Sequence, residues 1–115
     1  MTDPREIQRQ MQDAAQHLRL AIDELAGLAA ARVRAEIEAS EAYDEALVDA
    51  VGSNVAEKEA RARLQTKQLR RTAEESKSQE QVCKTKIRSW QSILSGWQSV
   101  ASAYKSEANF ARTGP

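Results

Sequence analysis

Residues Leu69 to Ala111, LRRTAEESKSQEQVCKTKIRSWQSILSGWQSVASAYKSEANFA, carry the strongest pattern in the sequence. Apolar or small residues recur along this stretch at alternating intervals of four and three, which is the heptad pattern of a coiled-coil helix. We call this series the seam of the second helix, and Glu80 is its one charged member. The series consists of Leu69, Ala73, Ser76, Glu80, Cys83, Ile87, Trp90, Leu94, Trp97, Ala101, Tyr104, Ala108 and Ala111.

The first half of the chain carries a similar pattern. Asp3, Pro4 and Glu6 are typical of a helix start, because Asp caps the first turn and Pro fits within it. A series at intervals of four and three follows, made of Ile7, Met11, Ala14, Leu18, Ala21, Leu25 and Leu28. Beyond Leu28 the stripe shifts in phase, as a straight helix does against a strict heptad, to Ala29, Val33, Ser40, Tyr43 and Leu47. We predict one helix over residues 4–51.

A turn at residues 52–54 separates the two halves. Gly52 suits the end of the first helix, and Asn54 with Glu57 three residues later suits the start of the second. Such a short connection favours antiparallel neighbours, so we predict an all-α fold, a long antiparallel helical hairpin forming one domain, 1–115. The second helix is expected over 55–111, and its polar stretch 76–80 is a candidate kink. One continuous helix through the turn is the alternative.

Charge supports the hairpin. The formal net charge is zero, but residues up to Gly52 carry 11 acids and 5 arginines, whereas the later residues carry 6 acids and 12 bases. Antiparallel folding about the turn matches the two halves and fixes their register. The expected opposite-charge groups are Asp44, Glu41 and Glu38 with Arg61, Arg63 and Lys67; Arg32 and Arg34 with Glu74 and Glu75; and Asp23 and Glu24 with Lys84.

The composition narrows the classes of function. One histidine, His17, and one cysteine, Cys83, form no metal-ligand cluster, and no glycine-rich phosphate loop is present, so we predict no metal, no cofactor and no enzyme activity. No window holds the roughly 18 apolar residues of a membrane span, and the first residues are not a secretory signal. A single cysteine fits a reducing compartment, so we expect a cytoplasmic protein without membrane contact.

The end of the second helix is the strongest candidate for an interface. No acidic residue lies between Val82 and Ser106, and serine and glutamine flank the large aromatic residues, which is typical of a surface covered by another chain. Tyr104 and Phe110 are expected beyond the end of the first helix. We therefore predict self-association into a helical bundle, and contact with another protein, through one set of residues: Ile87, Trp90, Leu94, Trp97, Tyr104 and Phe110.

The same half of the chain is rich in bases. A basic groove with aromatic residues is also the pattern of single-stranded nucleic-acid binding. Pairing with the acidic first helix is the simpler explanation for much of this charge. The candidate nucleic-acid contacts are Arg70, Arg71, Lys84, Lys86 and Arg88.

The segment Gly52 to Ala60, GSNVAEKEA, with its following basic helix and the ending FARTGP, resembles small helical proteins of bacteriophages and prophages. Those proteins accompany genes for single-strand annealing recombinases and replication. The resemblance covers the second half of the chain only. It implies an accessory role in phage DNA recombination or replication in the host cytoplasm, and a scaffold or chaperone of phage assembly is the structural alternative.

Overall fold

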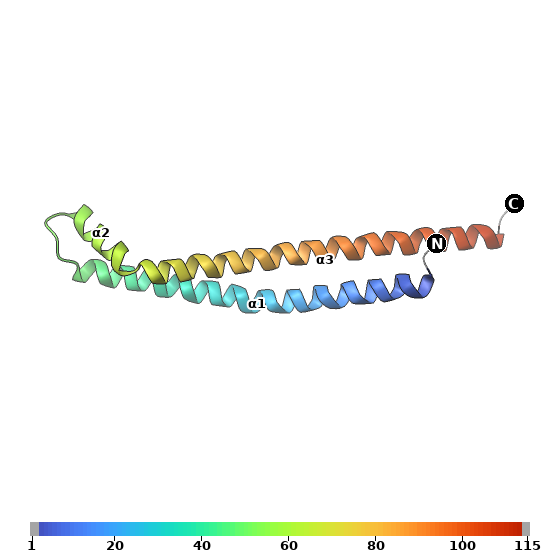
Figure 1. Ribbon diagram of the computed structural model, residues 1–115, viewed down its shortest axis with the longest axis horizontal. Helices are drawn as coiled ribbons and strands as arrows, with labels where there is room; N and C mark the ends of the chain where they lie inside the picture. The colour runs from blue at the N-terminus through green and yellow to red at the C-terminus, as the bar shows by residue number, and fades with distance from the viewer. Residues whose placement is uncertain (1–2, 114–115) are drawn as a thin grey trace. The chain divides into compact units, whose positions relative to one another are not determined.

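A computed structural model describes residues 3–113 of the chain. Helix α1 spans Pro4–Asp49, α2 spans Val55–Gln65 and α3 spans Lys67–Thr113 (Figure 1). No strand occurs in this described part. The all-α helical hairpin predicted from the heptad patterns is therefore confirmed, and the alternative of one continuous helix is wrong.

The chain divides into two compact units. Unit 1 consists of Met1–Glu24 and Cys83–Pro115, and unit 2 consists of Leu25–Val82. The boundaries fall inside α1 and α3, so each unit contains one segment of each long helix. The sequence alone indicated one domain, because neither heptad series is interrupted where the units meet.

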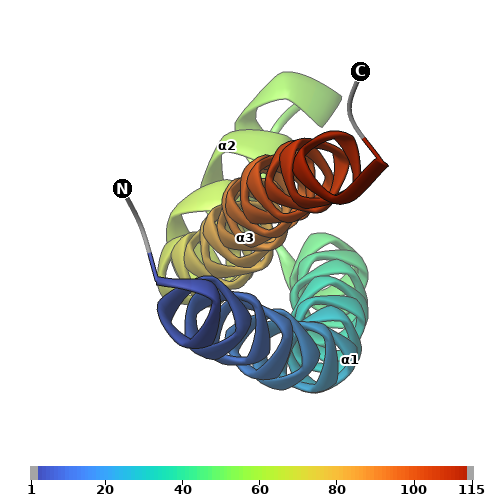
Figure 2. The ribbon, with the colours of Figure 1, turned by 90° about the vertical axis from the view of Figure 1, so that its right-hand side faces the viewer.

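Unit 1 is an antiparallel helix pair that packs along the predicted seams. Figure 2 shows its two segments side by side, the C-terminal part of α3 in red and the start of α1 in blue. Ile7, Ala14 and Ala21 are buried on α1, and Cys83 is buried on α3. The larger seam residues are half-buried, because two helices cover only one side of each side chain. They are Met11 and Leu18 on α1, and Ile87, Trp90, Leu94, Trp97 and Tyr104 on α3.

Unit 2 is built on alanine. The α1 seam continues in strict heptad register through Arg32, Ala35, Ala39, Ala42 and Ala46, and of these Ala39 and Ala46 are buried. The predicted shift in phase is therefore wrong as an account of the packing. Val33 and Ser40 are exposed, whereas Ala29, Tyr43 and Leu47 are half-buried beside the seam. Alanine allows close helix approach, which a search for the most hydrophobic side chains does not detect.

The turn caps the start of α2 as predicted, but α1 does not end in the predicted way. The Asn54 side chain accepts the Glu57 backbone N–H at 2.8 Å, and the Glu57 carboxylate accepts the Ser53 N–H at 3.1 Å and hydroxyl at 2.8 Å. However, α1 ends at Asp49, before the predicted Val51, and no described glycine has positive φ. Glycine instead suits position 52 because the space beside it is limited. A Cβ there would lie 3.2 Å from Lys58 Cγ.

The interruption of the second half lies at Thr66, not at residues 76–80. Those predicted residues lie within the unbroken helix α3, whereas Thr66 has φ −102° and ψ 11° and separates α2 from α3. Its hydroxyl donates to the Ala62 carbonyl at 2.8 Å, and the residue is buried. A threonine bonded to the carbonyl four residues earlier favours a bend. Figure 1 shows α2 turning away from the line of α3.

Several predicted charge pairs are replaced by others. Arg32 binds Glu80 rather than Glu74 or Glu75, and Glu24 binds Lys86 at 2.8 Å. Arg61 and Arg63 pair with glutamates four residues earlier in their own helix, Glu57 and Glu59. Local pairs form within α2 because residues four apart are neighbours on a helix surface. The antiparallel orientation inferred from charge is correct, although these four residues have other partners than those predicted.

Candidate interaction surfaces

The aromatic end of the seam packs inside unit 1. His17 stacks on Trp90 with ring centroids 4.3 Å apart and an interplanar angle of 17°. His17 Nδ1 lies 2.9 Å from the Asp13 carbonyl oxygen and 3.5 Å from its carboxylate. The imidazole is thus held by its own helix against one face of Trp90. Trp90 therefore faces the first part of α1, and His17 lies beside the α1 seam residue Leu18.

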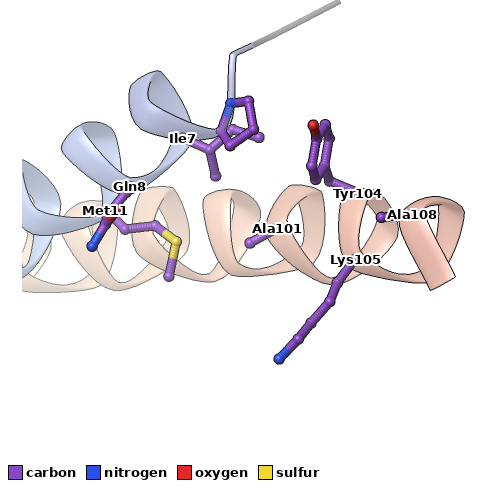
Figure 3. A pocket seen from close by; sticks show the side chains of 8 residues that line it. Ile7, Gln8, Met11, Ala101, Tyr104, Lys105 and Ala108 are labelled. Carbon is purple, nitrogen blue, oxygen red and sulfur yellow. The ribbon is translucent and has the colours of Figure 1, made fainter. Parts of the chain in front are cut away.

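Tyr104 lies against the start of α1 and not beyond it, so that part of the prediction is wrong. Small residues on α3 leave space beside its ring, and the result is an apolar hollow of about 280 Å³ (Figure 3). Ile7 closes the hollow from α1, and Lys105 extends away from it. The hollow is lined by Pro4, Ile7, Gln8, Met11, Ala101, Tyr104, Lys105 and Ala108.

The six predicted interface residues fall into two groups. Ile87, Trp90, Leu94, Trp97 and Tyr104 all lie on the face of α3 that packs against α1, and each is half-buried there. Phe110 is different, because its side chain is 70% exposed. Contact of any of these residues with a second chain stays a prediction. In the structure, the five seam residues pack against α1 of the same chain.

The five predicted nucleic-acid contacts do not share one face. Lys84 and Arg88 are four residues apart and lie on one flank of α3, whereas Lys86 projects from the other flank and binds Glu24. This hydrogen bond raises the pKa of Lys86. In unit 2, Arg70 donates from Nη2 to the Arg63 carbonyl at 2.7 Å, and Arg71 is exposed.

A polar hollow in unit 2 brings basic and hydroxyl groups together. It has a volume of about 390 Å³ and is lined by Ala39, Ser40, Tyr43, Arg63 and Arg70. Arg70 belongs to the predicted nucleic-acid set, but Arg63, Ser40 and Tyr43 were assigned to the helix pair. Their convergence depends on the bend at Thr66, which sequence reasoning placed elsewhere.

A buried ion pair joins the two seams of unit 2. Glu80 is 6% exposed, and its carboxylate accepts a hydrogen bond from Arg32 Nε. Arg32 also binds Glu36, at 3.0 Å through Nη1. The bond to Glu80 is the main cause of the raised pKa of Arg32. Intervals of four and three continued from Leu28 place Arg32 on the α1 seam, opposite Glu80, the one acid of the α3 seam.

Cys83 is not part of a metal-binding cluster among the described residues. The Cys83 thiol is buried and donates to the Ala21 carbonyl at 3.3 Å. No group of three His, Cys, Asp or Glu side chains that could hold a metal ion occurs within residues 3–113. In the same part of the chain, every helix is too short of apolar residues to cross a bilayer.

Comparison with protein-family models, with curated proteins and with solved structures gives no match.

Proposed function

We propose that this chain is a non-enzymatic helical interaction protein that associates with itself and binds another protein. The observation that supports this proposal is the number of large apolar side chains that lie outside the seam and are exposed. Single exposed apolar residues are ordinary, but apolar residues repeated along one helix flank are typical of a surface that another helix covers. On α3 of unit 1 they are Ile93, Val100 and Phe110, with exposures of 42%, 42% and 70%.

The biological setting in this proposal is phage DNA recombination or replication in the host cytoplasm. It rests on the resemblance of Gly52 to Ala60 and of the chain end, and on nothing else. The structural alternative, a scaffold or chaperone of phage assembly, uses the same surfaces. The genes that flank the coding sequence separate these two settings, because recombinase genes favour the first and capsid or tail genes favour the second.

The decisive experiment combines mass measurement with partner capture. We expect light scattering after size exclusion to give a mass above one chain at micromolar concentration. We also expect the tagged chain to retain the recombinase or replication protein encoded beside it. A variant with Phe110→Ser should retain less of that partner, and Arg112→Ser is the matched control one half-turn along α3. A monomer that retains neither protein would contradict the proposal.

Single-stranded nucleic-acid binding is a second candidate function, favoured by the polar hollow of unit 2. Arg63 and Arg70 supply guanidinium groups for a phosphate, and the Tyr43 ring offers a stacking surface. We expect a fluorescent oligonucleotide to bind at about 50 mM salt and to be released steeply as salt rises. Arg63→Gln with Arg70→Gln should remove binding, whereas Arg34→Gln, at an exposed arginine outside the hollow, should not. No binding by the wild-type chain at low salt would exclude this function.

A further inference from the structure

The α3 segment of unit 1 carries a second heptad series beside its seam. It starts at Lys86 and proceeds at intervals of three and four, so its members share one flank of the helix. Every member is exposed. We call this series the outer stripe, and it consists of Lys86, Ser89, Ile93, Gly96, Val100, Ala103, Glu107 and Phe110.

We propose that the outer stripe is the self-association surface, and that it binds the outer stripe of a second copy in antiparallel orientation. This inference deepens the self-association in the proposed function and rests on it. The surface is distinct from the aromatic seam, whose Trp90, Trp97 and Tyr104 pack on α1 within the chain. A two-fold axis relates the copies, so one stripe has to complement itself.

The sizes of the side chains are self-complementary in antiparallel order. In the antiparallel register in which paired residue numbers sum to 196, the whole stripe overlaps its copy, and Ile93 lies opposite Ala103 and Val100 opposite Gly96. A large side chain then meets a small one in each central layer. In parallel order each residue would meet its own copy, so Ile93 would face Ile93 and the two glycines would face each other across a gap.

The charges favour the same orientation. The stripe has a lysine, Lys86, at one end and a glutamate, Glu107, at the other. Antiparallel pairing brings Lys86 of one copy, which binds Glu24 of its own chain, within one helical turn of Glu107 and Phe110 of the other. A Lys–Glu pair and a cation over an aromatic ring are both favourable there. Parallel pairing would instead oppose lysine to lysine and glutamate to glutamate.

Gly96 is a separate indication that another backbone approaches this flank. Glycine weakens a helix interior, and within the chain nothing requires it, because a Cβ at Gly96 would have no atom within 4 Å. In the antiparallel dimer, Val100 of the second copy lies over this position. The missing side chain then gives the room for the two helices to meet closely.

A pair of glycine substitutions provides a matched test. Gly96→Leu should raise the dimer dissociation constant at least about tenfold, because a bulky side chain overfills the contact. Gly27→Leu is the control, since Gly27 is also an exposed helix glycine whose Cβ would meet no atom within 4 Å. Both changes favour helix in the monomer, so a loss of mass specific to Gly96→Leu cannot come from unfolding. Circular dichroism of each variant verifies the helix content.

A charge exchange tests the orientation. Glu107→Lys should weaken the dimer. Adding Ser89→Glu, which lies directly opposite residue 107 in the antiparallel order, should restore it, because a lysine and a glutamate then meet between the copies. The measurement is analytical ultracentrifugation of the full chain over a range of concentrations. A wild-type monomer would contradict both this inference and the self-association in the proposed function. A dimer that Gly96→Leu leaves intact would contradict the outer stripe alone, and a dimer that the double exchange does not restore would contradict the antiparallel order.

Discussion

A carboxylate buried in a helical seam needs a cation, and in unit 2 Glu80 has Arg32. Desolvation disfavours a charged side chain, and a good hydrogen-bonded partner offsets that penalty without making the pair better than two apolar residues. This pair therefore specifies which residues of α1 and α3 meet more than it stabilises them. Its value to the fold lies in register, since the alanines around it would pack equally well one turn away.

The asymmetry between breaking and replacing this ion pair can be measured. We expect Arg32→Leu to lower the midpoint of thermal unfolding clearly, because Glu80 loses its guanidinium partner inside the seam. The double change Arg32→Leu with Glu80→Leu should recover most of that loss. Arg34→Leu, an exposed neighbour, is the control. Equal midpoints for Arg32→Leu and Arg34→Leu, followed by circular dichroism, would contradict this role of Arg32.

The turn contains a group whose ionisation stabilises the fold. Hydrogen bonds from the Ser53 backbone and hydroxyl lower the pKa of Glu57 below its ordinary value of 4.5. A lowered pKa in the folded state means that the stabilisation is complete above pH 4.5. It is lost as the pH falls from 4.5 through the lower pKa of the folded chain.

Glu57→Gln should remove this contribution to acid unfolding between those two values. Glu59→Gln, two residues along α2, removes a carboxylate outside the cap and should leave that part of the pH profile in place. Asn54→Ala should lower the free energy of unfolding by about 1 kcal/mol at neutral pH, since it removes the side-chain acceptor of the Glu57 N–H. Urea titrations at a series of pH values test all three variants.

At the scale of a helix, Thr66 decides where the second half of the chain bends. Spin labels at Lys58 on α2 and Lys77 on α3 report the bend within unit 2. In Thr66→Ala the hydroxyl bond to Ala62 is lost, and we expect the label separation to lengthen toward the roughly 28 Å of a continuous helix. Thr72→Ala removes an equivalent bond, from Thr72 to the Gln68 carbonyl, in the interior of α3. No change in Thr66→Ala relative to Thr72→Ala would show that the bend has another cause.

The sequence predicted the helices better than their details, for physical reasons that differ between residues. Trp90, Trp97 and their seam neighbours were identified because large residues at heptad spacing have few alternatives to burial. The α1 seam of unit 2 was misplaced because Val33 outweighs Ala35 on any hydrophobicity scale, although the alanine is the better fit to close helices. The Thr66 bend was missed because a hydroxyl that bonds backward leaves no periodic trace.

The candidate surfaces were also predicted only in part. Phe110 was correctly expected to lack cover from its own chain, because it lies after the last residue that α1 can reach. Tyr104 was wrongly placed beyond the start of α1. Symmetric pairing about the turn matches each α1 residue with a residue nearer to the turn than its actual neighbour on α3. The outer stripe was not recognised at all. Its centre is Gly96, which a search for hydrophobic residues passes over.

Across the molecule, the two units differ in the apolar area that they can bury. Unit 1 buries tryptophan, leucine and isoleucine in part, whereas unit 2 depends on alanine and on the Arg32–Glu80 pair. Because burial stabilises in proportion to area, we expect unit 2 to unfold at a lower urea concentration.

Two optical signals separate the units. Both tryptophans of the chain lie in unit 1, so their emission reports that unit, whereas circular dichroism at 222 nm reports helix throughout. We expect dichroism to begin its transition before the tryptophan emission shifts, with a gap that exceeds experimental error. Coincident transitions would instead indicate one cooperative unfolding step.

The composition of unit 1 from two distant pieces of chain has a consequence during synthesis. Unit 2 is continuous in sequence, so all of it is synthesised before Cys83 and the residues after it. Met1–Glu24 has no packing partner until then. A force-sensitive arrest peptide would detect the two closures separately. It would be joined after residue 82, and then after residue 115, through a linker long enough to span the exit tunnel. In the interval Ile7, Met11 and Leu18 remain open to chaperones, and on a crowded polysome they are also open to the emerging α3 of a neighbouring chain.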